Sequence, residues 1–180
     1  TGGYMSIPIC LAAKILKLKI LLLEPNLVMG RANLFLLNYC DKIFTYSRNI
    51  KNLPKKMRYK NFVIKPLIRK NIFLAKTKPK KKQVKFSILI IGGSQGAKKF
   101  DDLFKTDLIK LSQNFKIRLF HQTSNKNLKD LKSFYFENNI NSEVFVYSKH
   151  LHKIITKCDF VITRSGASTI NELVFLEKPF

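Results

Sequence analysis

Apolar residues along the chain alternate between two spacings. Short continuous apolar runs, typical of buried strands, are followed by longer segments in which apolar residues recur every three or four positions, as on one face of a helix. We expect strands at 19–24, 42–47, 60–68, 85–91, 115–122, 143–148 and 159–165, and helices at 7–17, 32–40, 97–113, 127–139, 150–158 and 168–177. Such alternation predicts βαβ units, and therefore parallel sheets covered by helices.

A lysine-rich segment, KTKPKKKQVK at 76–85, separates two runs of these units. A charge run in this position is typical of a solvated linker. The sequence therefore predicts a pair of Rossmann-like parallel-sheet domains, 1–75 and 86–180, joined by the linker 76–85. The chain starts at Thr1 without a methionine and ends where a further strand is expected, so both domains are expected to be incomplete.

The stretch GGSQG at 92–96 follows an expected strand and opens an expected helix. Ligands of parallel sheets bind beyond the carboxyl ends of strands. Glycines let the backbone approach an anion, the helix start offers unpaired N–H groups, and Ser94 adds a hydroxyl donor. The stretch matches neither the dinucleotide motif nor the P-loop. A phosphate site and a plain tight turn both fit it.

The stretch RSGASTINE at 164–172 is likewise a loop of small residues between an expected strand and an expected helix. The backbone N–H groups of Ala167, Ser168 and Thr169 are placed to meet a second face of the same phosphates. Glu172 is expected in the first helical turn, where its carboxylate can accept hydrogen bonds from the two hydroxyls of a ribose. The alternative is a capping box, in which Thr169 and Glu172 close the start of the helix; spacing alone favours this alternative.

Three single residues are weaker candidates. Asn26 follows a buried strand and can either bind a sugar hydroxyl or stabilise a turn. Arg69 carries a guanidinium that matches a phosphate, although it is one of 34 basic residues. His121 ends a strand, where an internally hydrogen-bonded histidine is the alternative to a ligand contact.

Composition narrows the classes of function. The hydrophobic content of 46% supports a folded core, and the net charge of +23 would attract anions such as nucleic acid, lipid head groups or sugar nucleotides. Cys10, Cys40 and Cys158 lie in apolar surroundings and are expected to be reduced. Neither metal-ligand spacing nor a Ser-His-Asp order is present, so a metalloenzyme or hydrolase finds no support. Lysines interrupt the apolar stretch 7–24, which argues against a membrane span and leaves membrane-surface association open.

The chain resembles the MurG family of N-acetylglucosaminyltransferases. The stretches TGGYMSIP, LEPNLVMGRANLFL, IIGGSQGAKKF, LFHQT and CDFVITRSGASTINEL occur in the family's order and spacing, and the resemblance covers nearly the whole chain. It implies a GT-B-type enzyme, with the acceptor on the N-terminal domain and the donor on the C-terminal domain. It also implies transfer from UDP-N-acetylglucosamine to lipid I, at an anionic membrane surface on the cytoplasmic face of the bacterial inner membrane. Neither a cofactor nor nucleic acid is expected.

The resemblance also implies roles for individual residues. Asn26 would bind the donor sugar, Arg69 and Ser94 the diphosphate, and Ser148 the uracil through its backbone. The helix start would bind phosphate and sugar through Ala167, Ser168 and Thr169, and Glu172 would bind the ribose. The family's base is expected before residue 1, so this chain alone is expected to be inactive. Alternatives are another UDP-sugar glycolipid transferase of the same fold, a nucleotide-binding chain without activity, and a basic nucleic-acid-binding module.

Overall fold

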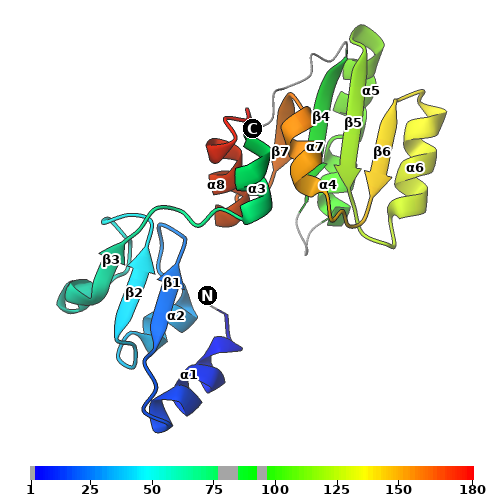
Figure 1. Ribbon diagram of the computed structural model, residues 1–180. Helices are drawn as coiled ribbons and strands as arrows, with labels where there is room; N and C mark the ends of the chain where they lie inside the picture. The colour runs from blue at the N-terminus through cyan, green and yellow to red at the C-terminus, as the bar shows by residue number, and fades with distance from the viewer. Residues whose placement is uncertain (1–2, 77–84, 93–96) are drawn as a thin grey trace. The chain divides into compact units, whose positions relative to one another are not determined.

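A computed structural model describes residues 3–76, 85–92 and 97–180 (Figure 1). The chain divides into two compact units, Thr1–Leu67 and Ile68–Phe180. Each unit is built around a parallel sheet with helices packed on it. The predicted Rossmann-like parallel α/β fold is therefore confirmed in both units.

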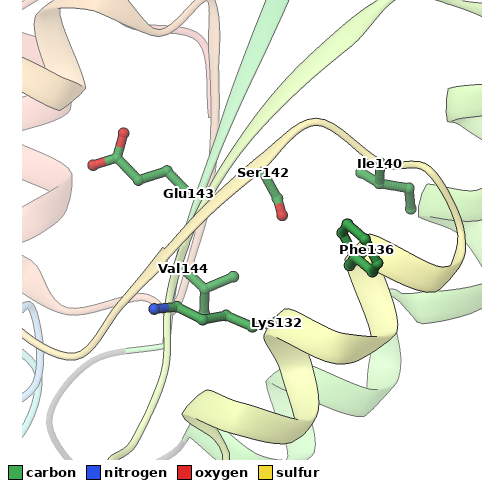
Figure 2. Close-up of a pocket in the computed structure, with 6 residues that line it drawn as sticks. All are labelled: Lys132, Phe136, Ile140, Ser142, Glu143 and Val144. Carbon is green, nitrogen blue, oxygen red and sulfur yellow. The ribbon is translucent and has the colours of Figure 1, made fainter.

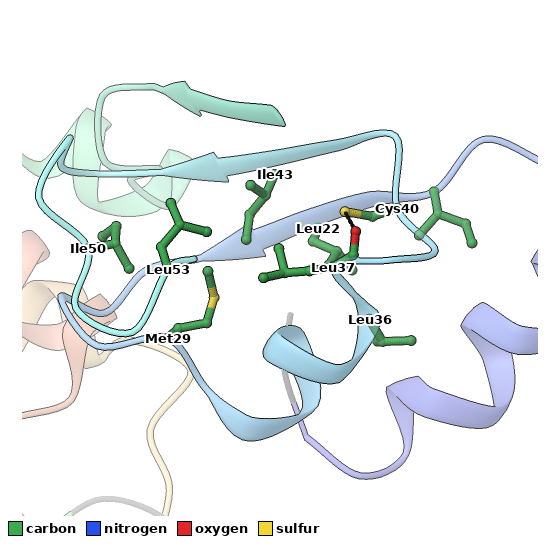
Figure 3. Close-up of a cluster of buried hydrophobic side chains, with 9 residues drawn as sticks. Leu22, Met29, Leu36, Leu37, Cys40, Ile43, Ile50 and Leu53 are labelled. Carbon is green, nitrogen blue, oxygen red and sulfur yellow. Dashed lines mark hydrogen bonds between the residues drawn. The ribbon is translucent and has the colours of Figure 1, made fainter. Parts of the chain in front are cut away.

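The first unit has the element order α1 (Ser6–Ile15), β1 (Leu21–Glu24), α2 (Arg31–Leu36), β2 (Lys42–Thr45), a 3-10 helix η1 (Lys55–Lys60) and β3 (Asn61–Val63). Its sheet has the order β1-β2-β3, and both strand pairs are parallel. Side chains alternate between the two faces of a strand, so Leu22 and Ile43 point into a buried cluster with residues of α2, whereas Leu21 is exposed. Figure 3 shows this cluster.

The second unit begins with α3 (Lys70–Lys76). It continues with β4 (Phe86–Ile91), α4 (Ala97–Leu103), α5 (Lys105–Asn114), β5 (Ile117–Gln122), α6 (Leu128–Glu137), β6 (Ser142–Phe145), α7 (Leu151–Lys157), β7 (Phe160–Thr163) and α8 (Ala167–Phe175). The strand order is β6-β5-β4-β7, with every pair parallel.

Helices cover both faces of the second sheet. Ile88 and Ile90 of the central strand β4 pack with residues of α5 and α6. Leu89 and Ile91, on the opposite face of β4, pack with residues of α3, α7 and α8. All four side chains are buried, which explains why β4 reads as a continuous apolar run rather than an alternating one.

The boundary between the units lies elsewhere than the sequence suggested. The predicted first domain, 1–75, extends too far, because residues 68–75 belong to the second unit: Ile72 of α3 is 1% exposed and packs among the residues of that unit's core. Of the expected linker 76–85, residues 77–84 lie outside the described part of the chain. The single helix expected at 97–113 is two helices, α4 and α5, which meet at Phe104.

Candidate functional site

In the sheet of the second unit, the side on which the chain adds new strands switches between β4 and β7. From β4 the chain adds β5 and then β6 on one side, and later adds β7 on the other. Ligands of open parallel sheets bind outside the carboxyl ends of the strands at such a switch point. Ile91 and Thr163, the last residues of β4 and β7, are register partners, so Gly92 and Arg164 leave the sheet at the same edge. Ser94, expected at the diphosphate, lies outside the described residues.

The start of α8 offers backbone donors at this edge. Gly166 is the N-cap residue, with extended backbone and no hydrogen bond from a capping side chain. Ala167, Ser168 and Thr169 form the first turn, whose N–H groups have no acceptor within the helix. Gly166 and Ser168 are exposed. The three residues predicted from the sequence therefore form the positive end of a helix, the kind of backbone site that binds anions.

Glu172 does not cap this helix. Because α8 already begins at Ala167, Thr169 lies inside the helix and Glu172 falls in its second turn. The capping box favoured by the spacing is therefore wrong, and so is the expected position of Glu172 in the first turn. Its carboxylate is buried, and a buried charge needs a partner.

That partner is Arg69. The Arg69 Nε lies 2.5 Å from Glu172 Oε1, and the Arg69 Nη2 lies 2.6 Å from Glu172 Oε2. The Arg69 side chain is 65% exposed and the Glu172 side chain 3%. The hydrogen bond that Arg69 donates to Glu172, together with the negative charge of that carboxylate, raises the pKa of the Arg69 guanidinium. The structure thus brings together Arg69, which precedes α3, and Glu172 of α8.

Ser148 lies in this loop, directly after Tyr147. Its hydroxyl accepts a hydrogen bond from the His150 N–H at 3.2 Å, and its carbonyl accepts one from the Leu151 N–H at 3.3 Å. Both bonds shape the turn that opens α7. The contact of its backbone with uracil remains a prediction.

A buried polar network ties α4 to the end of β5. The Asp101 carboxylate accepts hydrogen bonds from Thr123 Oγ1 at 2.6 Å and Asn127 Nδ2 at 2.7 Å. His121 Nε2 lies 3.2 Å from Asp101 Oδ1, and His121 Nδ1 lies 2.7 Å from the Tyr135 hydroxyl. Asp101, His121 and Tyr135 are all buried.

Burial lowers the pKa of His121 to about 4, although the Asp101 carboxylate favours the charged form. The imidazole is therefore neutral near pH 7. This confirms His121 as an internally hydrogen-bonded residue. No local sequence pattern indicates Asp101, because its partners follow it by 20 to 26 residues and only the packing of α4 on the sheet unites them.

In the first unit, Asn26 belongs to a turn organised by Glu24. The buried Glu24 carboxylate accepts hydrogen bonds from the Asn26 side chain at 2.8 Å, the Gly30 N–H at 2.8 Å and the Asn33 side chain at 2.9 Å. A Cβ atom at Gly30 would lie 3.1 Å from Glu24 Oε2, so the glycine permits this close approach. Asn26 is exposed. Its role in the turn is established, and its contact with a sugar remains a prediction.

A hollow of about 430 Å³ lies elsewhere on the second unit (Figure 2). It is lined by Lys132, Phe136, Ile140, Ser142, Glu143 and Val144. Ser142 begins β6, so the hollow lies at the amino end of one edge strand, whereas α8 follows the carboxyl end of the opposite edge strand. It is separate from the site at β4 and β7.

Comparison with known proteins points to the same region. Residues 87–180 match the family described as "Glycosyltransferase family 28 C-terminal domain". A UDP-N-acetylglucosamine--N-acetylmuramyl-(pentapeptide) pyrophosphoryl-undecaprenol N-acetylglucosamine transferase of Pelagibacter ubique (strain HTCC1062) is 49% identical over 100% of this chain and 50% of its own length. A protein of the same name from Rickettsia bellii (strain RML369-C) is 34% identical over 99% of this chain and 52% of its own length.

The crystal structure of Acinetobacter baumannii MurG is also similar, with a TM-score of 0.67 and 25% identity over 96% of this chain and 47% of that chain. The chain spans about half the length of the curated relatives it matches. The resemblance seen in the sequence is thus matched by relatives and by a solved structure. Since the family match covers more than half of the 180 residues, the chain belongs to the family with a glycosyltransferase family 28 C-terminal domain.

Proposed function

We propose that the chain is part of a glycosyltransferase that moves N-acetylglucosamine from UDP-N-acetylglucosamine to lipid I, the undecaprenyl-diphospho-muramoylpentapeptide, to form lipid II for peptidoglycan synthesis. One observation carries the proposal: α8, which follows β7 at the switch point, starts without a capping side chain and carries a buried carboxylate, that of Glu172. These are the groups that a diphosphate and a ribose require. The names of the Pelagibacter and Rickettsia relatives support the donor and the acceptor.

The second unit binds the donor in this proposal. The N–H groups of Ala167, Ser168 and Thr169 hold phosphate, and Glu172 accepts hydrogen bonds from the ribose hydroxyls. The remaining contacts of UDP-N-acetylglucosamine come from Arg69, Ser94, Ser148 and, in the first unit, Asn26. The first unit is the acceptor and membrane side.

The transfer inverts the anomeric centre. The muramoyl hydroxyl oxygen attacks the anomeric carbon as the bond to the UDP oxygen breaks, and UDP leaves with an added negative charge. Helix N–H groups and a guanidinium aimed at that charge stabilise the transition state. The start of α8 and Arg69 supply these groups. The hydroxyl proton passes to a base that we assign to no residue of the described chain.

The first unit has features of a membrane surface contact. Met5, Ile9, Ile15 and Leu16, in and beside α1, are exposed, and Lys14, Lys17 and Lys19 lie among or beside them. Apolar side chains bordered by lysines suit the boundary of an anionic bilayer. No helix in the described part of the chain is long and apolar enough to cross a membrane. We propose peripheral binding at the cytoplasmic face of the bacterial inner membrane.

A chimera tests the proposed activity. The chain replaces the matching half of the Pelagibacter ubique relative, and radiolabelled transfer from UDP-N-acetylglucosamine to lipid I is measured. We expect lipid II from the chimera and none from the 180-residue chain alone, because half of the relative's length is missing from it. A folded chimera that transfers a different sugar, or uses a different glycolipid, would replace this function by that of another UDP-sugar transferase. Turnover by the isolated chain would overturn the expected need for the other half.

A further inference from the structure

In this structure the Arg69 guanidinium is bound to the Glu172 carboxylate, the same group that is proposed to bind the ribose. The guanidinium meets Glu172 end-on, with one N–H donor on each carboxylate oxygen, at 2.5 and 2.6 Å. Two vicinal hydroxyls would approach a carboxylate from the same end to bind both oxygens. Since the rest of the Glu172 side chain is buried, with 3% exposed, the guanidinium and the ribose compete for one position.

The guanidinium can leave without moving the backbone that carries it. The Arg69 carbonyl accepts hydrogen bonds from the N–H groups of Ile72 and Phe73 at the start of α3. The helix is held in place by the buried Ile72 and by stacking of Phe73 on Phe175 of α8, with ring centroids 5.7 Å apart. The arginine side chain is 65% exposed, so it reaches solvent by rotation about its own bonds.

We propose that Arg69 is a specificity-determining residue that makes the site select nucleotides over nucleosides. The ribose displaces the guanidinium from Glu172, and the freed guanidinium binds the phosphate carried on the same ribose. A nucleoside breaks the ion pair and offers the guanidinium no other anion. A nucleotide supplies a phosphate, which can accept two parallel hydrogen bonds from the guanidinium. The inference rests on the proposed binding of a UDP-sugar. It adds that Arg69 exchanges one partner, the Glu172 carboxylate, for another, the phosphate of the ligand.

Calorimetric titration of the 180-residue chain with UDP and with uridine, at pH 8, tests the exchange. The variant Arg69→Gln keeps a polar side chain but removes the charge. Its affinity for UDP is expected to fall about tenfold, because a charge-assisted contact with phosphate is lost. Its affinity for uridine is expected to rise about threefold, because an ion pair with one exposed partner no longer competes. Arg69→Lys, which keeps a charge but has no fork, should lie between wild type and Arg69→Gln for both ligands.

The variant Arg118→Gln is the matched control, since Arg118 is a half-exposed arginine of β5 that pairs with Glu143 at 3.7 Å. It removes the same charge from a strongly basic chain and should leave both affinities within twofold of wild type. Circular dichroism checks that each variant is folded. If uridine binds equally or more weakly to Arg69→Gln while wild type still binds UDP, the exchange is wrong and the proposed function stands. If folded wild type binds neither ligand, the proposed donor site fails and the exchange fails with it.

Discussion

Glu172→Ala is expected to lower the affinity of the chain for UDP-N-acetylglucosamine by at least about 30-fold. The expectation follows from two hydrogen bonds between ribose hydroxyls and a charged carboxylate, each of which contributes about 1.5–3 kcal/mol, less the roughly 1 kcal/mol that separating Arg69 from Glu172 costs the wild type. The carboxylate lies on α8, the helix that follows β7 at the switch point and whose first turn is proposed to hold the phosphates. Isothermal titration calorimetry of wild type and variant measures the change.

Glu137→Ala is the matched control for this variant. Glu137 is an exposed glutamate in the last turn of α6, so its removal changes the net charge equally without touching the site. We expect unchanged affinity for this control. Equal affinity of wild type and folded Glu172→Ala would show that Glu172 does not bind the ribose. The Arg69–Glu172 ion pair would then have only a structural role, in holding α3 against α8.

Asp101→Ala is expected to lower the free energy of unfolding of the second unit by about 3 kcal/mol. The substitution removes the acceptor that Thr123 and Asn127 share. The buried Thr123 hydroxyl and the half-buried Asn127 amide then lose their hydrogen bonds, and the buried His121 loses the neighbouring carboxylate. Urea unfolding followed by circular dichroism measures the change, because the chain has no tryptophan to report it.

The adjacent residue provides a close control. Asp102 is also in α4, its side chain is 59% exposed, and it pairs at the surface with Lys105 at 2.8 Å. Surface ion pairs contribute little, so Asp102→Ala should cost less than about 1 kcal/mol. Similar losses from both substitutions would show that α4 depends on helical charge rather than on the buried network.

The periodicity of apolar residues was sufficient to predict the strands of the second sheet. The run at 85–91 predicted β4 correctly because Ile88–Ile91, which are buried on both faces of the sheet, are apolar at every position. The same periodicity was insufficient to predict helix α3, because its apolar residues Ile72, Phe73 and Leu74 are few and lie between charged residues and a lysine run. Only their packing on the second unit reveals the helix.

The site was partly predictable for a related physical reason. A small-residue loop followed by a helix is a local feature, so Ala167, Ser168 and Thr169 were found at the start of α8 as expected. The pairing of Arg69 with Glu172 joins residues 103 positions apart, and no local pattern encodes it. The spacing of Thr169 and Glu172 matched a capping box, but the helix starts earlier, at Ala167.

The central claim is that UDP-N-acetylglucosamine binds at the carboxyl ends of β4 and β7. The most direct test is a titration of the isotope-labelled 180-residue chain with this sugar nucleotide, followed by amide chemical shifts at a salt concentration that screens non-specific attraction to the basic surface. We predict saturable shifts concentrated at Arg69 and at Arg164–Glu172. Shifts that do not saturate, that spread over the basic surface, or that centre on Lys132, Phe136 and Ser142 at the hollow of α6 and β6 would contradict the account.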